Sequence, residues 1–415
     1  MEIGLGFIGL TLGLVVVLWA ATRNAAIAGP LVIAFAARAL LAVIDVLVYK
    51  LPGAGDGIGW DRVAAYYASN GVEGTFRHID FGHGLYMWLM SVVYALVGRS
   101  PLLIQSINVL IGTLLVLTIW RLACQLTPDA RTQRRVAWLM ALTPSLIFFS
   151  SVLLREVVVT YPLAVSVLYL VRWYRERRLG LAFIAVANLL LSMAFHSGGL
   201  AVLLFAGLWL IGSWFRALLS GKLETLGRST LALIVGLAVV GVVLASGFGQ
   251  QKFEGLQSGD LSTLSERQEG FAHGRAAYLE DLHATSTTDL IWQTPIRVTY
   301  FLFAPFPWML ETGSDAFGVL DSLLFLTLIG WTVRNRKAVV EVPLRLLTLG
   351  VFSAMAVVFA IGVSNYGTAV RHRDKMLPLL IAAAASIPGR RKPQKVEPAL
   401  LSLRRRVDGR LGSLT

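Results

Sequence analysis

The chain contains a series of apolar segments, each long enough to cross a lipid bilayer as a helix of about 20 residues. We expect spans at 3–20, 28–49, 101–123, 136–154, 157–174, 180–196, 198–215, 228–247, 316–333, 343–364 and 369–388. Hydrophobic residues make up 56% of the chain and charged residues 15%, against roughly 45–50% and about 25% in soluble domains. The sequence therefore predicts an all-α polytopic membrane protein with about 11 transmembrane helices.

Basic residues gather in alternate linkers between these spans. They are Arg131, Arg134 and Arg135, then Arg172, Arg175, Arg177 and Arg178, then Arg216, Lys222 and Arg228, then Arg334, Arg336 and Lys337, and finally Arg390, Arg391, Lys392 and Lys395. Because positive charge resists translocation during insertion, these linkers are expected to face the cytoplasm, with the N-terminus outside. The net charge of +13 then reflects inner loops rather than a nucleic-acid partner.

Two long segments, at about 50–83 and 248–296, lie on the outer side in this topology. Apolar stretches at 84–98 and 297–310 are short or interrupted by Pro305 and Pro307, so we expect interfacial or re-entrant helices there. Loops of this length in a compact bundle are usually functional. The expected organisation is a transmembrane bundle over 1–388, which includes these loops, and a basic cytoplasmic tail over 389–415.

The segment from Asn365 to Lys375, at the expected outer mouth of the last span, breaks the positive-inside trend. It carries Arg371, Arg373 and Lys375, and such charges at a membrane boundary normally face the bundle interior or a wet cavity. Arg371 and Lys375 are four residues apart, so on a helix they share a face and can converge on one anion. A lipid phosphate or pyrophosphate is the natural candidate. The alternative is that these side chains snorkel to anionic headgroups.

Two shorter polar signals lie at the same expected side. Arg155 and Glu156 are adjacent between two spans with nearly no loop, which is typical of either a structural ion pair or a ligand contact. His196 precedes two glycines in a tight turn, and glycines permit close backbone approach.

The first outer loop contains the candidate general bases. We expect Asp61 near the N-terminus of a helix that follows a glycine-rich stretch, where a carboxylate is favoured, either as a cap or as a base. Asp56 lies just upstream, and Tyr66 lies roughly one turn beyond Asp61. A carboxylate placed near the bilayer surface suits deprotonation of a sugar hydroxyl whose donor is a lipid-borne phosphate.

The second outer segment mixes charged side chains with aromatic ones. Its polar residues include Glu266, Arg267, Glu269, His273, Arg275, Glu280, Asp281 and His283. This mixture, followed by Trp308, suits carbohydrate, so Arg275 and Trp308 are candidate substrate contacts. The acidic residues and histidines also offer ligands for a divalent metal, although no H-E-x-x-H motif occurs. The single cysteine, Cys124, excludes an intrachain disulfide.

Four segments carry a likeness to a known family. They are Asp61 to Tyr66, Gly84 to Pro101, Thr143-Pro144-Ser145 leading to Arg155-Glu156, and Arg371 to Pro378. In this order they resemble the GT-C superfamily of membrane glycosyltransferases and the related bacterial polysaccharide polymerases. Asp61 is followed by Arg62 rather than by a second acidic residue, which leaves the base open. One additional span precedes the span that leads into this loop. This arrangement resembles the polymerase-like branches more than the simplest mono-glycosyl transferases.

The resemblance implies a GT-C-like fold and an inverting transfer from a polyprenyl-phosphate or polyprenyl-pyrophosphate saccharide to a sugar acceptor. It implies a site at the outer face of the bacterial inner membrane, within cell-surface polysaccharide assembly such as that of O-antigen or exopolysaccharide. No nucleotide or other cofactor is needed, because the lipid carries the sugar. The partners expected are the lipid-linked donor, an acceptor glycan, the bilayer and other assembly proteins.

In this hypothesis cations neutralise the leaving phosphate and a carboxylate deprotonates the acceptor. The phosphate contacts expected are Arg371, Arg373, Lys375 and Arg155, the bases are Asp61 or else Asp56, and the positioning residues are Glu156, Tyr66, His196 and His372. Two alternatives stay open. A transporter or flippase of a lipid-linked anion would use Arg38 and Asp45 in the second span, and a non-catalytic scaffold would dock through the basic tail.

Overall fold

The computed structural model describes residues 2–53, 55–221, 262–271 and 274–388, together with isolated positions at 227, 230, 234, 236 and 241. In this part of the chain every regular element is a helix, and one isolated bridge joins Ala277 to Asn365. Seven helical segments there are long and apolar enough to cross a membrane. The corresponding helices are α1 (Glu2–Arg23), α2 (Ala28–Leu47), α6 (Pro101–Leu126), α9 (Glu156–Glu176), α11 (Leu200–Leu219), α16 (Gly313–Arg334) and α18 (Pro343–Gly362).

These seven helices coincide with seven predicted spans, so the chain is a multi-pass helical membrane protein. The predicted span 180–196 corresponds to the shorter α10 (Leu179–Phe195). The span predicted at 228–247 and the tail 389–415 lie outside the described residues. The total number of crossings stays a prediction.

Two predicted spans are broken helices rather than continuous ones. The segment 136–154 forms α7 (Ala130–Leu142) and α8 (Pro144–Phe149), and 369–388 forms α19 (Tyr366–Asp374) and α20 (Leu377–Ala385). Pro144 and Pro378 each lie at the start of the second helix of a pair. A proline lacks the backbone donor and clashes with the preceding turn, so each break follows from the sequence.

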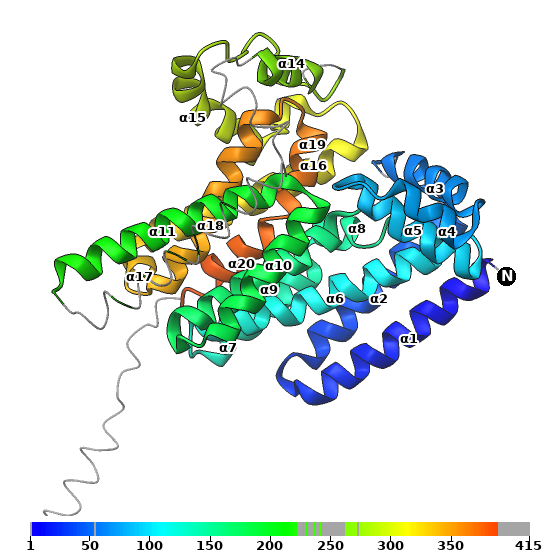
Figure 1. Ribbon diagram of the computed structural model, residues 1–415, viewed down its shortest axis with the longest axis horizontal. Coiled ribbons are helices and arrows are strands. Elements are labelled where there is room, and N and C mark those ends of the chain that lie inside the picture. The colour runs from blue at the N-terminus through cyan, green and yellow to red at the C-terminus, as the bar shows by residue number, and fades with distance from the viewer. Residues whose placement is uncertain are drawn as a thin grey trace, which may run out of the picture.

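Hydrogen bonds tie the helix ends together at what we call the basic end of the bundle. The guanidinium of Arg135, on α7, donates to the carbonyls of Ala385 and Ile387 at 2.6 and 2.8 Å. Arg345, at the start of α18, donates to the carbonyls of Leu126 and Ser386, both at 3.0 Å. The start of α9, the end of α2 and the helices of the first loop lie at the opposite end, which we call the site end (Figure 1).

The first long loop is helical and forms a cap at the site end (Figure 1). It contains α3 (Gly55–Ala68), α4 (Gly71–Thr75), a short turn at Phe76–His78 and α5 (His83–Val97), the apolar stretch expected at 84–98. The prediction that Asp61 lies near a helix N-terminus is wrong, because α3 begins at Gly55. The glycine-rich stretch is helical where α3 meets Leu153: a Cβ on Gly57 would lie 2.6 Å from the Leu153 carbonyl oxygen.

The second long segment also differs from the expectation. Its helices are α14 (Ser262–Phe271) and α15 (Thr287–Phe303), which lie beyond α16 and α19 in Figure 1. The helix expected at 297–310 instead begins ten residues earlier, at Thr287, and ends at Phe303. Ser286 and Asp289 form a capping box that starts α15, and Pro305 prevents its continuation.

Candidate functional site

Arg371 joins three segments that are far apart in the sequence. Its Nε donates to Oε1 of Glu156 at 2.5 Å, and its Nη1 donates to the carboxylate of Asp56. The guanidinium carbon lies 5.3 Å from the ring centroid of Trp60. The side chain of Asp56 is 59% exposed, that of Arg371 20% and that of Glu156 1%. The site end therefore holds a buried carboxylate and an exposed one on the same arginine.

Lys375 binds the same buried carboxylate. Its Nζ lies 3.4 Å from Oε1 of Glu156 and 3.3 Å from the carbonyl oxygen of Arg371. Arg371 and Lys375 therefore share a face, as their spacing predicts, and they converge on Glu156. We call Asp56, Trp60, Arg155, Glu156, Arg371 and Lys375 the Arg371 cluster.

Arg155 enters this cluster from the turn before α9. Its Nη1 donates to the Phe195 carbonyl at 2.8 Å, and its guanidinium carbon lies 5.8 Å from the Trp60 centroid. Burial lowers the pKa of Arg155 to about 10. Arg155 and Glu156 both belong to the cluster, but the carboxylate of Glu156 forms its salt bridges with Arg371 and Lys375.

The turn that carries Arg155 and Glu156 is fixed by a buried amide on α6. The Asn108 Nδ2 donates to the carbonyls of Val152 and Leu154 at 2.9 and 3.1 Å, and lies 3.0 Å from the Tyr86 hydroxyl. Within the described part of the chain, Nε of Arg155 and Oε2 of Glu156 are buried without a hydrogen-bond partner. Buried polar groups are normally paired, so the cluster offers one cationic donor and one carboxylate acceptor to a ligand.

Trp60 is the member of the cluster to which the sequence analysis assigned no role in the site. Its ring is stacked with that of His83 at a centroid distance of 6.5 Å and contacts Tyr86 edge-on at a centroid distance of 6.0 Å. Both partners lie on α5, which therefore fixes the position of Trp60. The available signal was its helical spacing: Trp60 lies one turn after Asp56 in α3, on the same face.

Arg373 points away from the Arg371 cluster, which corrects the expectation that both arginines hold one phosphate. Arg373 is fully buried, and its Nε lies 3.2 Å from Oδ2 of Asp321 on α16. Its Nη1 donates to the Leu302 carbonyl at 2.6 Å and to the Ser322 hydroxyl at 3.1 Å. Arg373 therefore holds α19 against α15 and α16.

The polar residues of the second span have contacts within the bundle. Arg38 is fully buried, donates to the Ser150 hydroxyl at 2.8 Å and interacts electrostatically with the buried Asp374. Asp45 accepts from the Gln105 amide at 2.7 Å and from the Leu51 backbone at 3.0 Å. Asp45 therefore fixes the chain that leads from α2 into α3.

Asp61 lies on another side of α3, where both of its carboxylate oxygens accept hydrogen bonds. The Tyr94 hydroxyl donates to its Oδ1 at 2.7 Å, and Arg99 donates to both of its oxygens. Tyr66, which is mostly exposed, lies further along α3 beside the ring of Tyr67. The structure therefore brings Asp56, and not Asp61 or Tyr66, to the Arg371 cluster.

Two histidines adjoin the cluster. The ring of His372 lies 5.2 Å from that of His196 and stacks on Phe359 at 4.7 Å. Its Nδ1 lies 3.0 Å from the Lys375 ammonium. His196 accepts from the Gly198 backbone through Nδ1 at 3.0 Å. His196 and His372, which are far apart in the sequence, are therefore neighbours next to Lys375.

Arg275 and Trp308 belong to the second segment rather than to the cluster. Arg275 pairs with Asp315 and donates to the Tyr366 hydroxyl at 2.9 Å, so it ties this segment to the starts of α16 and α19. Trp308 is largely exposed and stacks on Phe306 with a centroid distance of 4.7 Å.

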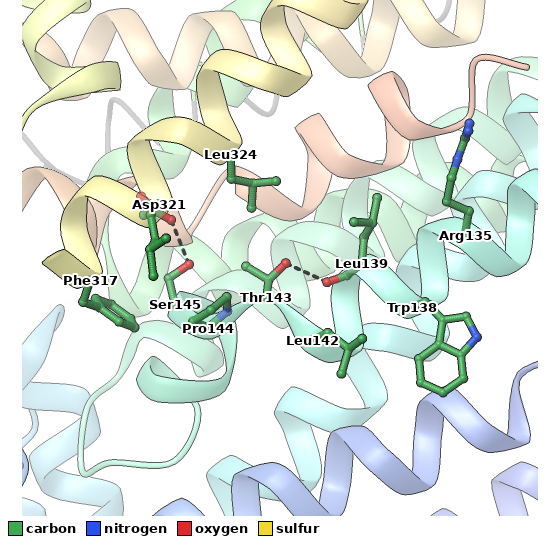
Figure 2. Close-up of a pocket in the computed structure, with 11 residues that line it drawn as sticks. Arg135, Trp138, Leu139, Leu142, Thr143, Pro144, Ser145, Phe317, Asp321 and Leu324 are labelled. Atoms are coloured by element: carbon green, nitrogen blue, oxygen red, sulfur yellow. Dashed lines mark hydrogen bonds between the residues drawn. The ribbon is translucent and has the colours of Figure 1, made fainter. Parts of the chain in front are cut away.

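An apolar groove with a volume of about 390 Å³ lies between α7, α8 and α16. Figure 2 shows the lining side chains that project from these helices. Its apolar lining includes Trp138, Leu139, Leu142, Phe317, Leu320 and Leu324. Within the groove, the Ser145 hydroxyl donates to Asp321 at 2.9 Å. Asp321 is the partner of Arg373, and a lone carboxylate in an apolar span was a signal that the sequence analysis did not use.

The groove is connected to the Arg371 cluster through aromatic side chains. Phe317 lines the groove and lies 5.6 Å from Phe148, centroid to centroid. Phe148, Phe317 and Trp60 pack against one hydrophobic cluster, which includes Val370, the residue before Arg371. One set of packed apolar side chains therefore extends from the groove to the Arg371 cluster.

Metal ligands are not grouped in the part of the chain that the structure describes: no three His, Cys, Asp or Glu side chains there are placed to hold an ion. His273 lies outside the described residues. Comparison of the sequence with protein-family models and with curated proteins finds no match.

Proposed function

We propose that the protein is a membrane glycosyltransferase or polysaccharide polymerase that transfers a saccharide from a lipid-linked phosphate or pyrophosphate to a sugar acceptor. The observation that carries this proposal is the Arg371 cluster. It combines three cations, a buried carboxylate and an exposed carboxylate, and it adjoins an apolar groove. These are the groups that a lipid-phosphate leaving group and a hydroxyl acceptor require.

The cations match the charge that develops in such a transfer. The acceptor oxygen attacks the anomeric carbon, the bond from that carbon to the phosphate oxygen breaks, and the phosphate keeps the electron pair. Arg371, Lys375 and Arg155 are held in place before the reaction by Glu156 and Trp60. Preorganised donors lower the barrier because they need no rearrangement as charge builds up.

The geometry favours Asp56 as the base that takes the acceptor proton. Its carboxylate is exposed and accepts a hydrogen bond from Arg371. Asp61, which the sequence ranks first, has both oxygens engaged by Tyr94 and Arg99. A base must reach its proton within hydrogen-bond distance, so the accessible carboxylate of Asp56 suits this role.

The groove suits the hydrocarbon chain of the donor. Its walls on α7 and α16 are apolar, and Phe317 at its end packs against the same hydrophobic cluster as Trp60. A lipid bound with its chain in the groove would present its phosphate to the Arg371 cluster. Positively charged loops favour the cytoplasm, so the proposal places the site end at the outer face of a bacterial inner membrane.

Transport of a lipid-linked anion is the second candidate, and one observation favours it. Two further arginines, Arg38 and Arg373, are fully buried behind the cluster. Buried cations within a bundle are typical of ion and substrate pathways. Transport moves the lipid-linked substrate across the bilayer and forms no glycosidic bond, so the products separate the two candidates.

The test is turnover of a cell-derived lipid-linked saccharide by the protein in proteoliposomes, with product length and released lipid phosphate both measured. We expect Arg371→Gln to lower turnover about 10²- to 10³-fold, the usual effect of removing one charge-stabilising donor. Arg172→Gln, which removes an arginine at the basic end, is the matched control and is expected to turn over like the wild type. Equal turnover by Arg371→Gln, or lipid movement without a new glycosidic bond, would contradict the transferase.

A further inference from the structure

The Arg371 cluster contains more fixed positive than negative charge. Arg155, Arg371 and Lys375 surround one buried carboxylate, that of Glu156. Asp56 is the other anion. Its side chain is exposed, Arg371 donates a hydrogen bond to it, and it interacts electrostatically with Arg155. An incoming anion that replaces Asp56 therefore meets three fixed cations and one fixed anion. The surplus is two positive charges.

Two carboxylates adjoin the buried arginines behind the cluster. Nε of Arg373 lies 3.2 Å from Oδ2 of Asp321, and Arg38 interacts electrostatically with Asp374. These two arginines therefore have carboxylate neighbours of their own and are separate from the three cations around Glu156. Nδ1 of His372 lies 3.0 Å from Nζ of Lys375.

Trp60 holds two of the cations at one place. The guanidinium carbons of Arg371 and Arg155 lie 5.3 and 5.8 Å from its ring centroid, within the range of cation–π attraction. His83 and Tyr86 fix the indole from α5. An aromatic ring positions guanidinium groups without the charge of a carboxylate, so the positive charge stays available to a ligand.

We propose that this arrangement selects a lipid-linked diphosphate over a lipid-linked monophosphate, with Trp60 as the specificity-determining residue. The inference rests on the proposed function and names its donor class. A diphosphate that is esterified at both ends carries two negative charges, which balance the surplus. A monophosphate diester carries one. Each guanidinium can form paired hydrogen bonds with one phosphoryl group, and Lys375 adds a point charge.

A monophosphate leaves one buried guanidinium without an anionic partner. Nε of Arg155 already lacks a hydrogen-bond partner within the described residues. A hydrogen bond to a charged group contributes about 1.5–3 kcal/mol, so we expect the diphosphate to bind about 10- to 100-fold more tightly.

The test measures binding of two probes to the full-length protein in lipid nanodiscs. The probes are the methyl esters of farnesyl phosphate and farnesyl diphosphate, which differ by one phosphoryl group and one charge. We expect Trp60→Leu and Arg155→Gln each to reduce the preference for the diphosphate probe to less than about threefold, mainly by weakening its binding. Trp60→Phe, which keeps an aromatic face, should retain most of it. Trp88→Leu, on α5 beside Phe76, is the matched control and should keep the full preference.

The outcomes separate this inference from the proposed function. Equal binding of both probes by the wild type would overturn the diphosphate preference while lipid-phosphate binding stands. Binding of neither probe would overturn both. An unchanged preference in folded Trp60→Leu would overturn the specificity role of Trp60. If Trp60→Leu does not fold, an unchanged preference in folded Arg155→Gln would overturn it, because Trp60 is proposed to act by holding Arg155.

Discussion

Helix α3 contributes to two carboxylate–arginine pairs that differ in which partner is buried. In the pair of Asp56 with Arg371, the carboxylate side chain is 59% exposed and the arginine 20%. In the pair of Asp61 with Arg99, the carboxylate is 7% exposed and the arginine 48%. The two pairs have the same chemistry and lie on one helix, yet the fixed partner is the cation in the first and the anion in the second.

The difference decides what each pair can do. An exposed ion pair contributes little stability, so its exposed member can leave at low cost. If Asp56 leaves, Arg371 is still held by Glu156 and Trp60 and can receive an anion. If Arg99 leaves, Asp61 keeps only the Tyr94 hydroxyl and becomes a buried, poorly paired carboxylate. The first pair suits a ligand site and the second suits a structural link.

The strongest way to break this comparison is to neutralise each carboxylate in turn. We expect Asp56→Asn to lower glycosyl transfer about 10²- to 10⁴-fold, the range for loss of a general base, with little change in thermal stability. Asp61→Asn should lower stability by about 1–3 kcal/mol, because the buried Tyr94 hydroxyl and the Arg99 guanidinium lose a charged acceptor, while turnover per folded molecule stays near that of the wild type. Transfer and thermal unfolding are measured for both variants.

The matched pair of variants leaves little room for another explanation. The same substitution is made twice on one helix, so a general effect on α3 would appear in both. Loss of transfer in Asp61→Asn with full transfer in Asp56→Asn would reverse the assignment and restore Asp61 as the base.

Much of the bundle could be predicted because its main signals are local. Seven apolar segments coincide with long apolar helices, and Pro144 and Pro378 mark the helix breaks that the span assignment ignored. The start of α3 was missed because glycines normally weaken helices. Gly57 lies within α3 at a position where Leu153 leaves no room for a side chain, which is a tertiary contact.

The contacts of the site could be predicted only where they follow from residue spacing within one helix. The spacing of Arg371 and Lys375 gives their shared face, and the two side chains do converge on Glu156. The direction of Arg373 depends on Asp321, which lies on another helix and is distant in the sequence. Trp60 likewise gains its role from arginines on two other segments, a relation that no local pattern contains.

A weaker effect tests whether Asp56 is the displaceable partner. We expect the methyl ester of farnesyl diphosphate to increase carbodiimide labelling of Asp56 several-fold, because the anion takes its place on Arg371. Labelling of Asp61 should stay low with and without the ligand, since it is buried and fully paired. Peptide mass spectrometry measures both sites in one sample. Ligand-induced protection of Asp56, or labelling of Asp61, would contradict the comparison.

The smallest expected effect concerns a third carboxylate, that of Asp289, which is exposed and nevertheless held by hydrogen bonds. Asp289 is exposed, yet it accepts hydrogen bonds from the Ser286 hydroxyl at 2.7 Å, the Trp292 indole at 3.2 Å and the Thr285 hydroxyl at 3.0 Å. These bonds lower the pKa of Asp289 to about 2. Unlike Asp56, this exposed carboxylate is engaged by its own neighbours at the start of α15 and is not expected to be displaced.

Because the pKa of Asp289 is depressed in the folded state, its stabilising effect is present above its ordinary pKa of about 3.9 and is lost as the pH falls through about 2. We expect protection of the first amides of α15 against hydrogen exchange, corrected for intrinsic rates, to be equal at pH 6 and pH 5 and lower at pH 2. Asp289→Asn should show reduced protection at every pH. Wild-type protection that is already reduced at about pH 4, near the ordinary pKa of an aspartate, would mean that these hydrogen bonds do not hold Asp289.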